Sequence, residues 1–135
     1  MATLPYNSTI YKNTLTQVQC TIAAGQTTSS ILRCIDSAIG TGTLVGIELP
    51  TGFTTGDLTF LRVDLINASP DAQLYVTDGV SNTVPITFPN VAAGKIVYPP
   101  FFFYGEDAIR IVSSVVQASA RTIIGYLQPI TQGAA

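Results

Sequence analysis

The sequence predicts an all-β fold: a β-sandwich or jelly roll of eight or nine short antiparallel strands with an extended N-terminal arm. Thr, Ile and Val supply 43 of the 135 residues, and β-branched side chains favour a pleated strand over a helix. Short apolar runs are separated by turn residues every eight to twelve positions, which is typical of two sheets sharing one core. No ten-residue segment combines helical apolar spacing with start and stop signals.

The first predicted strands lie at residues 15–23 and 30–35. In the first run, Val18, Cys20 and Ile22 alternate with polar side chains, which is the period of a half-buried strand. Residues 24–27 (AGQT) carry turn chemistry, so we expect the two runs to form a hairpin.

The next two runs are residues 44–49, which end at Pro50, and residues 57–66. We expect Phe53, in the loop between them, to pack onto the core. Along 57–66 the apolar positions change phase after Phe60, which predicts a bulge or bend and a change of sheet or partner.

Five further runs complete the predicted fold. Residues 74–77 and 84–88 flank Asp78-Gly79, a dipeptide suited to a tight hairpin, and three more runs follow at 95–98, 108–114 and 121–127. The strands therefore define a domain at 15–129. Residues 1–14 and 130–135 lack strand patterning and are interpreted as an N-terminal arm and a C-terminal tail, which become ordered only against something else.

The predicted surface is unusually poor in charge. Only 10% of the residues are charged, against about 25% in an ordinary soluble domain, whereas 39 are Thr, Ser, Asn or Gln. Neutral hydroxyls and amides cost less to desolvate than ions, so such a surface is easily covered by a protein partner. The alternative is a Thr-rich extracellular β protein.

Composition also excludes several function classes. A net charge of -2 offers no attraction for nucleic acid or an anionic membrane. The absence of His removes the commonest general base and metal-ligand nitrogen, and two Cys cannot form a four-thiolate zinc site. We therefore expect no enzyme activity, cofactor, metal or membrane span. The first fourteen residues lack a signal-peptide pattern, which predicts synthesis in a cytosol.

Cys20 and Cys34 are symmetric about the expected first turn, so they would lie opposite each other in that hairpin. A cytosolic origin favours two reduced core thiols. The alternative is a disulfide that closes a loop of about fourteen residues, worth about 3 kcal/mol in the chain-entropy model.

Other motifs are interpreted as structural. The glycine-rich segment 40–46 superficially resembles a nucleotide loop but precedes no helix, so we predict a turn before a strand. Four acidic residues lack the spacing of a calcium loop and are expected in solvated turns: Asp71, Asp78, Glu106 and Asp107. Glu48 and Asp64 are expected to pair with arginines across the sheet, with Arg33, Arg62 and Arg110 as candidates.

Four consecutive aromatic residues form the most conspicuous stretch: Phe101, Phe102, Phe103 and Tyr104. Side chains of an extended segment alternate between two faces, so these rings cannot all enter one core. We predict that some of them contact another protein, together with the arm residues Leu4, Tyr6, Ile10 and Tyr11. The alternatives are that this chain covers them itself, or that they form a sugar-binding platform.

Several segments resemble small virion proteins of tailed bacteriophages. The resemblance spans about residues 18–129 and is carried by IAAGQTTSS at 22–30, GIELP at 46–50, LTF at 58–60, AIRIVS at 108–113 and ARTII at 120–124. It implies similarity to capsid decoration or cement proteins with a jelly-roll core, which sit as oligomers where major capsid subunits meet. It implies no catalytic residues.

These observations predict a structural virion protein, assembled in the host cytoplasm, that binds between major capsid protein subunits and stabilises the shell. We expect a homo-oligomer, either a dimer or a trimer. One alternative is a structural protein of the phage tail or head–tail junction. The other is a carbohydrate-binding β-sandwich module, for which Tyr98 and Tyr104 are candidate contacts.

Overall fold

The computed structural model describes residues 16–36, 40–76, 84–98 and 108–129, and within these ranges every regular element is a β-strand. The strands are, in chain order, β1 (Thr16–Ile22), β2 (Leu32–Arg33), β3 (Ile35–Asp36), β4 (Gly40–Glu48), β5 (Gly56–Val63), β6 (Ala72–Gln73), β7 (Tyr75–Val76), β8 (Val84–Pro85), β9 (Phe88–Val91), β10 (Ile96–Val97), β11 (Ala108–Ser113) and β12 (Arg121–Pro129). The all-β prediction is confirmed.

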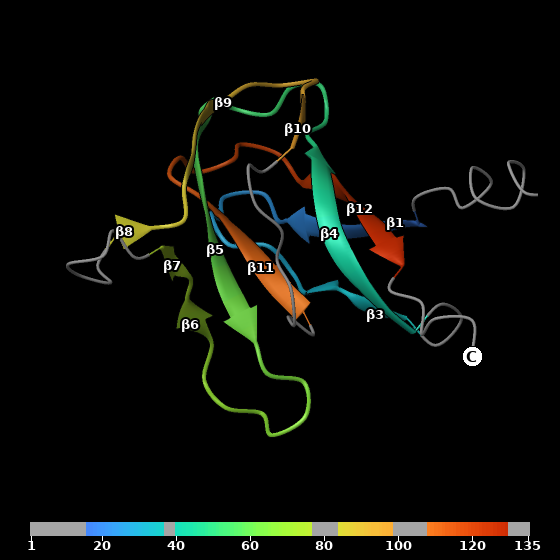
Figure 1. Cartoon of the computed structure of the whole chain (residues 1–135). Helices are drawn as coiled ribbons and strands as arrows, with labels where there is room; N and C mark the ends of the chain where they lie inside the picture. Colours follow the sequence, from blue (N-terminus) through green and yellow to red (C-terminus); the bar gives the residue numbers. More distant parts are fainter. Residues whose placement is uncertain (1–15, 37–39, 77–83, 99–107, 130–135) are drawn as a thin grey trace, which may run out of the picture.

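Two antiparallel sheets form the body of the fold (Figure 1). The first sheet has the order β1-β12-β4-β10, and β3 pairs with the start of β4. The second sheet has the order β2-β11-β5-β6, and β9 pairs with the start of β5. A separate two-stranded sheet joins β7 to β8. In the first sheet, β1 and β12 are neighbours although they come from opposite ends of the chain, as in a β-sandwich.

The core lies between the two sheets and receives large apolar side chains from both. Ile47, Ile123 and Leu127 of the first sheet are fully buried, as are Phe60 and Ile111 of the second. Burial of each such side chain contributes about 1.5–3 kcal/mol.

Two further aromatic side chains, one at the start of β9 and one in a loop, also reach this core. The ring of Phe88 packs edge-on against Phe60, with centroids 4.8 Å apart. Phe53, between β4 and β5, is buried, which confirms that its loop is held onto the core.

Each of the nine strand runs expected from sequence contains a strand, whereas β3, β6 and β9 were not identified from patterning. The pairing of Tyr75 with Pro85 and of Val76 with Val84 confirms the hairpin predicted around residues 78–79. Its turn, and Asp78 itself, lie outside the described residues.

The first predicted hairpin is wrong. β1 pairs with β12 over seven residue pairs, from Thr16 with Leu127 to Ile22 with Arg121. Residues 28–30 contact the end of β1 only briefly, and the chain then enters the second sheet, where β2 pairs with β11. Because residues 23–31 cross from one sheet to the other, Leu32 enters the core from the second sheet, whereas β1 lines the core from the first sheet.

The glycine-rich segment 40–46 is part of β4, not a turn as predicted. Its glycines permit close contacts within the sheet. A Cβ on Gly42 would lie 2.9 Å from the Cβ of Leu127, and one on Gly46 would lie 3.1 Å from Cε1 of Tyr98. Space, and not turn formation, explains glycine at these two positions.

The phase change in β5 is not caused by a bulge in its central pairing. β5 pairs with β11 from Leu58 to Val63 without a register shift. The partner on its other edge does change, from β9 at Gly56 and Leu58 to β6 at Leu61 and Arg62. The predicted change of partner therefore occurs, but β5 stays in one sheet.

Candidate functional site

The predicted contact residues all lie outside the described part of the chain. This applies to Phe101, Phe102, Phe103 and Tyr104, and to Leu4, Tyr6, Ile10 and Tyr11. Their role in an interface stays a prediction. The surface that the structure does describe provides a second candidate.

That candidate is the solvent-facing side of the first sheet. Ile47 of β4 and Leu49, which follows the strand, enter the core, so Glu48 points outward. The strand register places the outward residues of the neighbouring strands beside Glu48. We call the resulting surface the outer face; it consists of Gln17, Gln19, Thr21, Gly46, Glu48, Ile96, Tyr98, Thr122, Ile124, Tyr126 and Gln128.

Two tyrosines occupy the centre of the outer face, on either side of Gly46. A Cβ at Gly46 would lie 3.2 Å from Cδ1 of Tyr98 and 3.7 Å from Cδ2 of Tyr126. Both rings therefore rest over the bare backbone of β4. Tyr98 keeps 65% of its surface exposed and the neighbouring Ile96 keeps 48%, so an apolar patch faces solvent.

Glu48 is the one charged side chain of the outer face, and the Tyr126 hydroxyl donates a hydrogen bond to its carboxylate. This hydrogen bond raises the pKa of Tyr126; burial and the charge of Glu48 act in the same direction. The expected pairing of Glu48 with an arginine is therefore replaced by pairing with a tyrosine. The other residues of the face are amides, hydroxyls and apolar groups.

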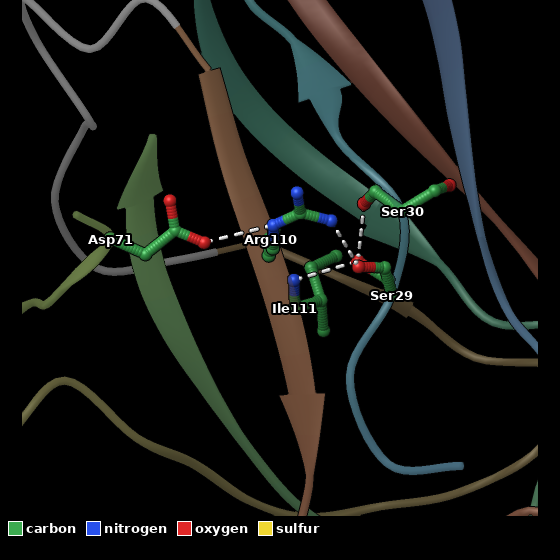
Figure 2. A network of polar contacts seen from close by, with 5 residues as sticks. All are labelled: Ser29, Ser30, Asp71, Arg110 and Ile111. Atoms are coloured by element: carbon green, nitrogen blue, oxygen red, sulfur yellow. Dashed lines mark hydrogen bonds and ion pairs between the residues drawn. The ribbon is translucent and has the colours of Figure 1, made fainter. Parts of the chain in front are cut away.

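A second polar cluster lies at the outer side of the second sheet (Figure 2). Arg110 Nε donates to Asp71 Oδ2 at 2.9 Å, and Arg110 Nη1 donates to the backbone oxygen of Ser29 at 3.1 Å. The Ser29 hydroxyl accepts a hydrogen bond from the Ile111 N–H at 2.9 Å and donates to the Ser30 carbonyl at 2.7 Å. The cluster anchors the crossing segment between the sheets to β11, which is a structural role.

Backbone hydrogen bonds, more than the charge of an arginine, hold the carboxylate of Asp64. Its Oδ1 accepts hydrogen bonds from the N–H groups of Ile66 and Asn67, at 3.0 and 2.9 Å, in the turn after β5. The bond from Asn67 is the main cause that lowers the pKa of Asp64, and the charge of Arg62 adds a small part.

Cys20 and Cys34 are both buried, and no disulfide joins them. The hairpin across which they were expected to face each other is not formed, because β1 pairs with β12. Burial raises the pKa of Cys20 to about 11, although a hydrogen bond with Ser29 acts in the opposite direction. A thiol that stays protonated at neutral pH is a poor nucleophile.

Sequence patterning missed Gln117, the one fully buried amide among the described residues. It lies in the loop between β11 and β12, where its neighbours include the exposed Val115 and Val116. Nothing in the local sequence distinguishes it from a solvated loop residue.

The described residues contain no group of three or more acidic or Cys side chains placed to hold a metal, and they enclose no pocket. They also contain no helix with the length and apolar character needed to cross a bilayer. Comparison with protein-family models, with curated proteins and with solved structures finds no match for the chain. The protein is thus defined as an all-β sandwich in which one sheet has an exposed face with a single charged residue.

Proposed function

We propose that this chain is a non-enzymatic structural protein of a tailed-bacteriophage particle, of the capsid decoration or cement class. The observation that carries the proposal is the outer face, which combines exposed Tyr98 and Ile96 with neutral polar groups and a single carboxylate. In this proposal the outer face docks onto neighbouring major capsid protein subunits and stabilises the shell.

The chemistry of the outer face suits a protein interface. Interfaces favour aromatic residues and disfavour charges at their centres, and Tyr98 lies among groups that are cheap to desolvate. The single charge, Glu48, already shares a hydrogen bond with Tyr126. A capsid lattice presents many equivalent sites, so modest affinity at each site is sufficient for an oligomer that engages several.

The proposal also retains the contacts predicted in the aromatic run 101–104 and in the N-terminal arm. Alanine substitution of Phe101, Phe102 and Phe103 is expected to leave the domain folded and to abolish binding to particles. Unchanged occupancy of the variant on particles would reject their assignment.

The outer face is tested by the double variant Ile96→Ser/Tyr98→Ala. Virions that lack the protein are mixed with purified wild type or variant, and occupancy is measured by quantitative mass spectrometry after density-gradient purification. The control is Val115→Ser/Val116→Ser, which removes two other exposed apolar side chains that lie away from the outer face. We expect occupancy to fall by at least about tenfold for the first variant only. A tenfold fall corresponds to a loss of about 1.4 kcal/mol of binding free energy.

Equal occupancy of both variants would contradict the proposed use of the outer face. Electron microscopy of the decorated virions locates the protein. Density on the capsid lattice supports the cement role, whereas density confined to the tail or the head–tail junction supports the alternative structural role.

The tyrosine pair also favours a second candidate, the carbohydrate-binding module. Tyr98 and Tyr126 flank Gly46 beside the carboxylate of Glu48, and sugar-binding surfaces combine aromatic rings with polar hydrogen-bonding groups. Binding on a glycan array that disappears with Tyr98→Ala, but persists with Val116→Ser, would support this function. An array with no binding would reject it.

A further inference from the structure

The edge strand of the first sheet has backbone groups that find no hydrogen-bond partner among the described residues, in a pattern that matches a second copy of itself. β1 is the terminal strand of its sheet and pairs on one side with β12. At its far end, the Thr21 carbonyl accepts a hydrogen bond from the Ser30 N–H at 2.9 Å, and the Thr21 N–H donates to the Ser30 hydroxyl at 3.0 Å. Thr21 therefore directs both backbone groups away from β12.

Every second residue of β1 directs its backbone N–H and C=O away from β12, as Thr21 does. Backbone groups of an antiparallel strand alternate between its two edges, so Gln17 and Gln19 share the orientation of Thr21. No described residue hydrogen-bonds to them on that edge, and both are exposed. Four backbone groups on two residues are thus left without a partner among the described residues, in strand geometry.

β1 itself lacks the sequence features that protect natural edge strands. Its sequence, TQVQCTI, contains no charged residue, no Pro and no Gly, and its pairing with β12 has no bulge. Exposed edges are normally blunted by lysine, proline or a bulge because they otherwise pair with another strand. An unprotected edge of this length favours strand addition.

We propose that β1 pairs antiparallel with β1 of a second copy of this chain, about a two-fold axis that passes beside Val18. In this register Gln17 faces Gln19 of the second copy, and each pair exchanges both of its backbone hydrogen bonds. It is the register that satisfies all four open groups of both copies. The two first sheets become one continuous sheet.

The side chains of β1 agree with this pairing. Val18 and its counterpart in the second copy face each other at the axis as a pair without backbone hydrogen bonds. The half-buried side chain of Val18 already packs against the core. Contact with Val18 of the second copy extends that core across the axis. On the opposite side, the amides of Gln17 and Gln19 face one another without like-charge repulsion. The dimer does not use the tyrosine pair, so it stands independently of the proposed function.

A cysteine cross-link tests the register. The Cα atoms of a pair without backbone hydrogen bonds lie about 4.5 Å apart, within the range that a disulfide spans. Val18→Cys is therefore expected to form a covalent dimer under mild oxidation, and peptide mapping should find residue 18 linked to residue 18. Gln128→Cys, which places an exposed thiol on β12, is the control and should stay monomeric on a non-reducing gel.

A proline substitution tests the edge itself. Gln19→Pro removes an N–H that points away from β12, so it preserves the internal ladder while it blocks the second copy. Sedimentation velocity should show a dimer for the wild type and for Gln19→Ala, and a monomer with an unchanged circular dichroism spectrum for Gln19→Pro. Gln19→Lys, which leaves the backbone intact, should weaken the dimer by about two- to fivefold, because the two introduced ammonium groups lie diagonally across the axis.

Two results would overturn the inference. One is a wild-type protein that stays monomeric at every concentration and forms no link at residue 18. The other is a dimer that Gln19→Pro and Gln19→Lys leave unchanged. The two proposals fail separately. The capsid proposal fails if Ile96→Ser/Tyr98→Ala still binds particles, whatever the dimer does. The dimer proposal fails on the two results above, whatever the particle binding.

Discussion

The side-chain oxygen of Gln117 accepts a hydrogen bond from the backbone N–H of Thr54 at 2.9 Å, although 63 positions separate the two residues in the chain. The same amide donates to the Ser113 hydroxyl at 3.2 Å and to the Val115 carbonyl at 3.2 Å. The backbone carbonyl of Gln117 also accepts a hydrogen bond from the Gly25 N–H at 2.7 Å. One buried residue therefore joins three loops at one end of the sandwich.

We predict that Gln117→Leu lowers the free energy of unfolding by about 1–3 kcal/mol, because it removes the acceptor of the partly buried Thr54 N–H and the other hydrogen bonds of a fully buried amide. Urea denaturation of the variant and the wild type measures the difference. Gln128→Leu is the control, since its side chain is exposed and lies away from the β1 edge, and it should change stability by less than about 0.5 kcal/mol. A change of similar size in both variants would contradict the role assigned to Gln117.

The local pattern predicted strands better than it predicted their partners. The alternation of Val18, Cys20 and Ile22 identifies β1 and its inner face, because burial of one face is a local property of the strand. Its pairing with β12 depends on residues about one hundred positions away, and no local signal encodes that distance. The turn chemistry at residues 24–27 is real, but it serves a crossing between sheets.

The candidate surface shows the same division. Low charge and many neutral polar residues predicted a surface suited to burial, and the outer face has that composition. The arrangement of Tyr98, Gly46 and Tyr126 was not predictable, because it arises from the pairing of β4 with two strands that are distant in the sequence. Gly46 in isolation resembled a turn residue, whereas the sheet uses it as a flat support for two rings.

Removal of Arg110 should destabilise the protein more than removal of Asp71, its partner in an ion pair. Both side chains are about one-third exposed, and such pairs contribute only about 0.2–1 kcal/mol. Asp71→Ala should therefore cost less than about 1 kcal/mol. Arg110→Ala should cost more, because Arg110 also donates to the Ser29 carbonyl.

Thermal denaturation at low and high salt distinguishes the two contributions of Arg110. The effect of Asp71→Ala should shrink as salt screens the ion pair, whereas part of the Arg110→Ala effect should persist. Equal losses for the two variants at low salt would show that the bond to Ser29 contributes nothing measurable.

Two glycines on paired strands should respond differently to alanine. A Cβ at Gly125 would lie 2.8 Å from Cδ1 of Leu32 and 3.1 Å from Cδ1 of Leu44, both of which are fully buried. Gly125→Ala should therefore cost about 1–3 kcal/mol through overpacking. Gly46→Ala meets the ring of Tyr98, which is largely exposed and has room to move, so its cost should be smaller.

A double-mutant cycle tests the contact at Gly46. If the Tyr98 ring is the obstacle, Tyr98→Ala should reduce the cost of Gly46→Ala and leave that of Gly125→Ala unchanged. Chemical denaturation of the single and double variants provides the four free energies. Additive effects at Gly46 would show that the strand tolerates alanine there without any contribution from Tyr98.

The buried thiol of Cys20 predicts a loss of stability at high pH. Its pKa is raised from 9.0 to about 11 in the folded protein, so between these values the unfolded chain releases a proton that the folded chain keeps. Ionisation then favours the unfolded state. The free energy of unfolding should be independent of this group below about pH 9 and fall by about 1.4 kcal/mol per pH unit above it, up to about pH 11.

Denaturation curves for wild type and Cys20→Ala between pH 8 and pH 11 isolate this contribution, because all other titrating groups are shared. Cys20→Ala should be less stable at pH 8, since it removes a buried side chain, and the gap should narrow as the pH rises. The native thiol should also resist alkylation at pH 8 until the protein is unfolded. A constant gap together with rapid alkylation would mean that Cys20 is accessible to solvent in the folded protein.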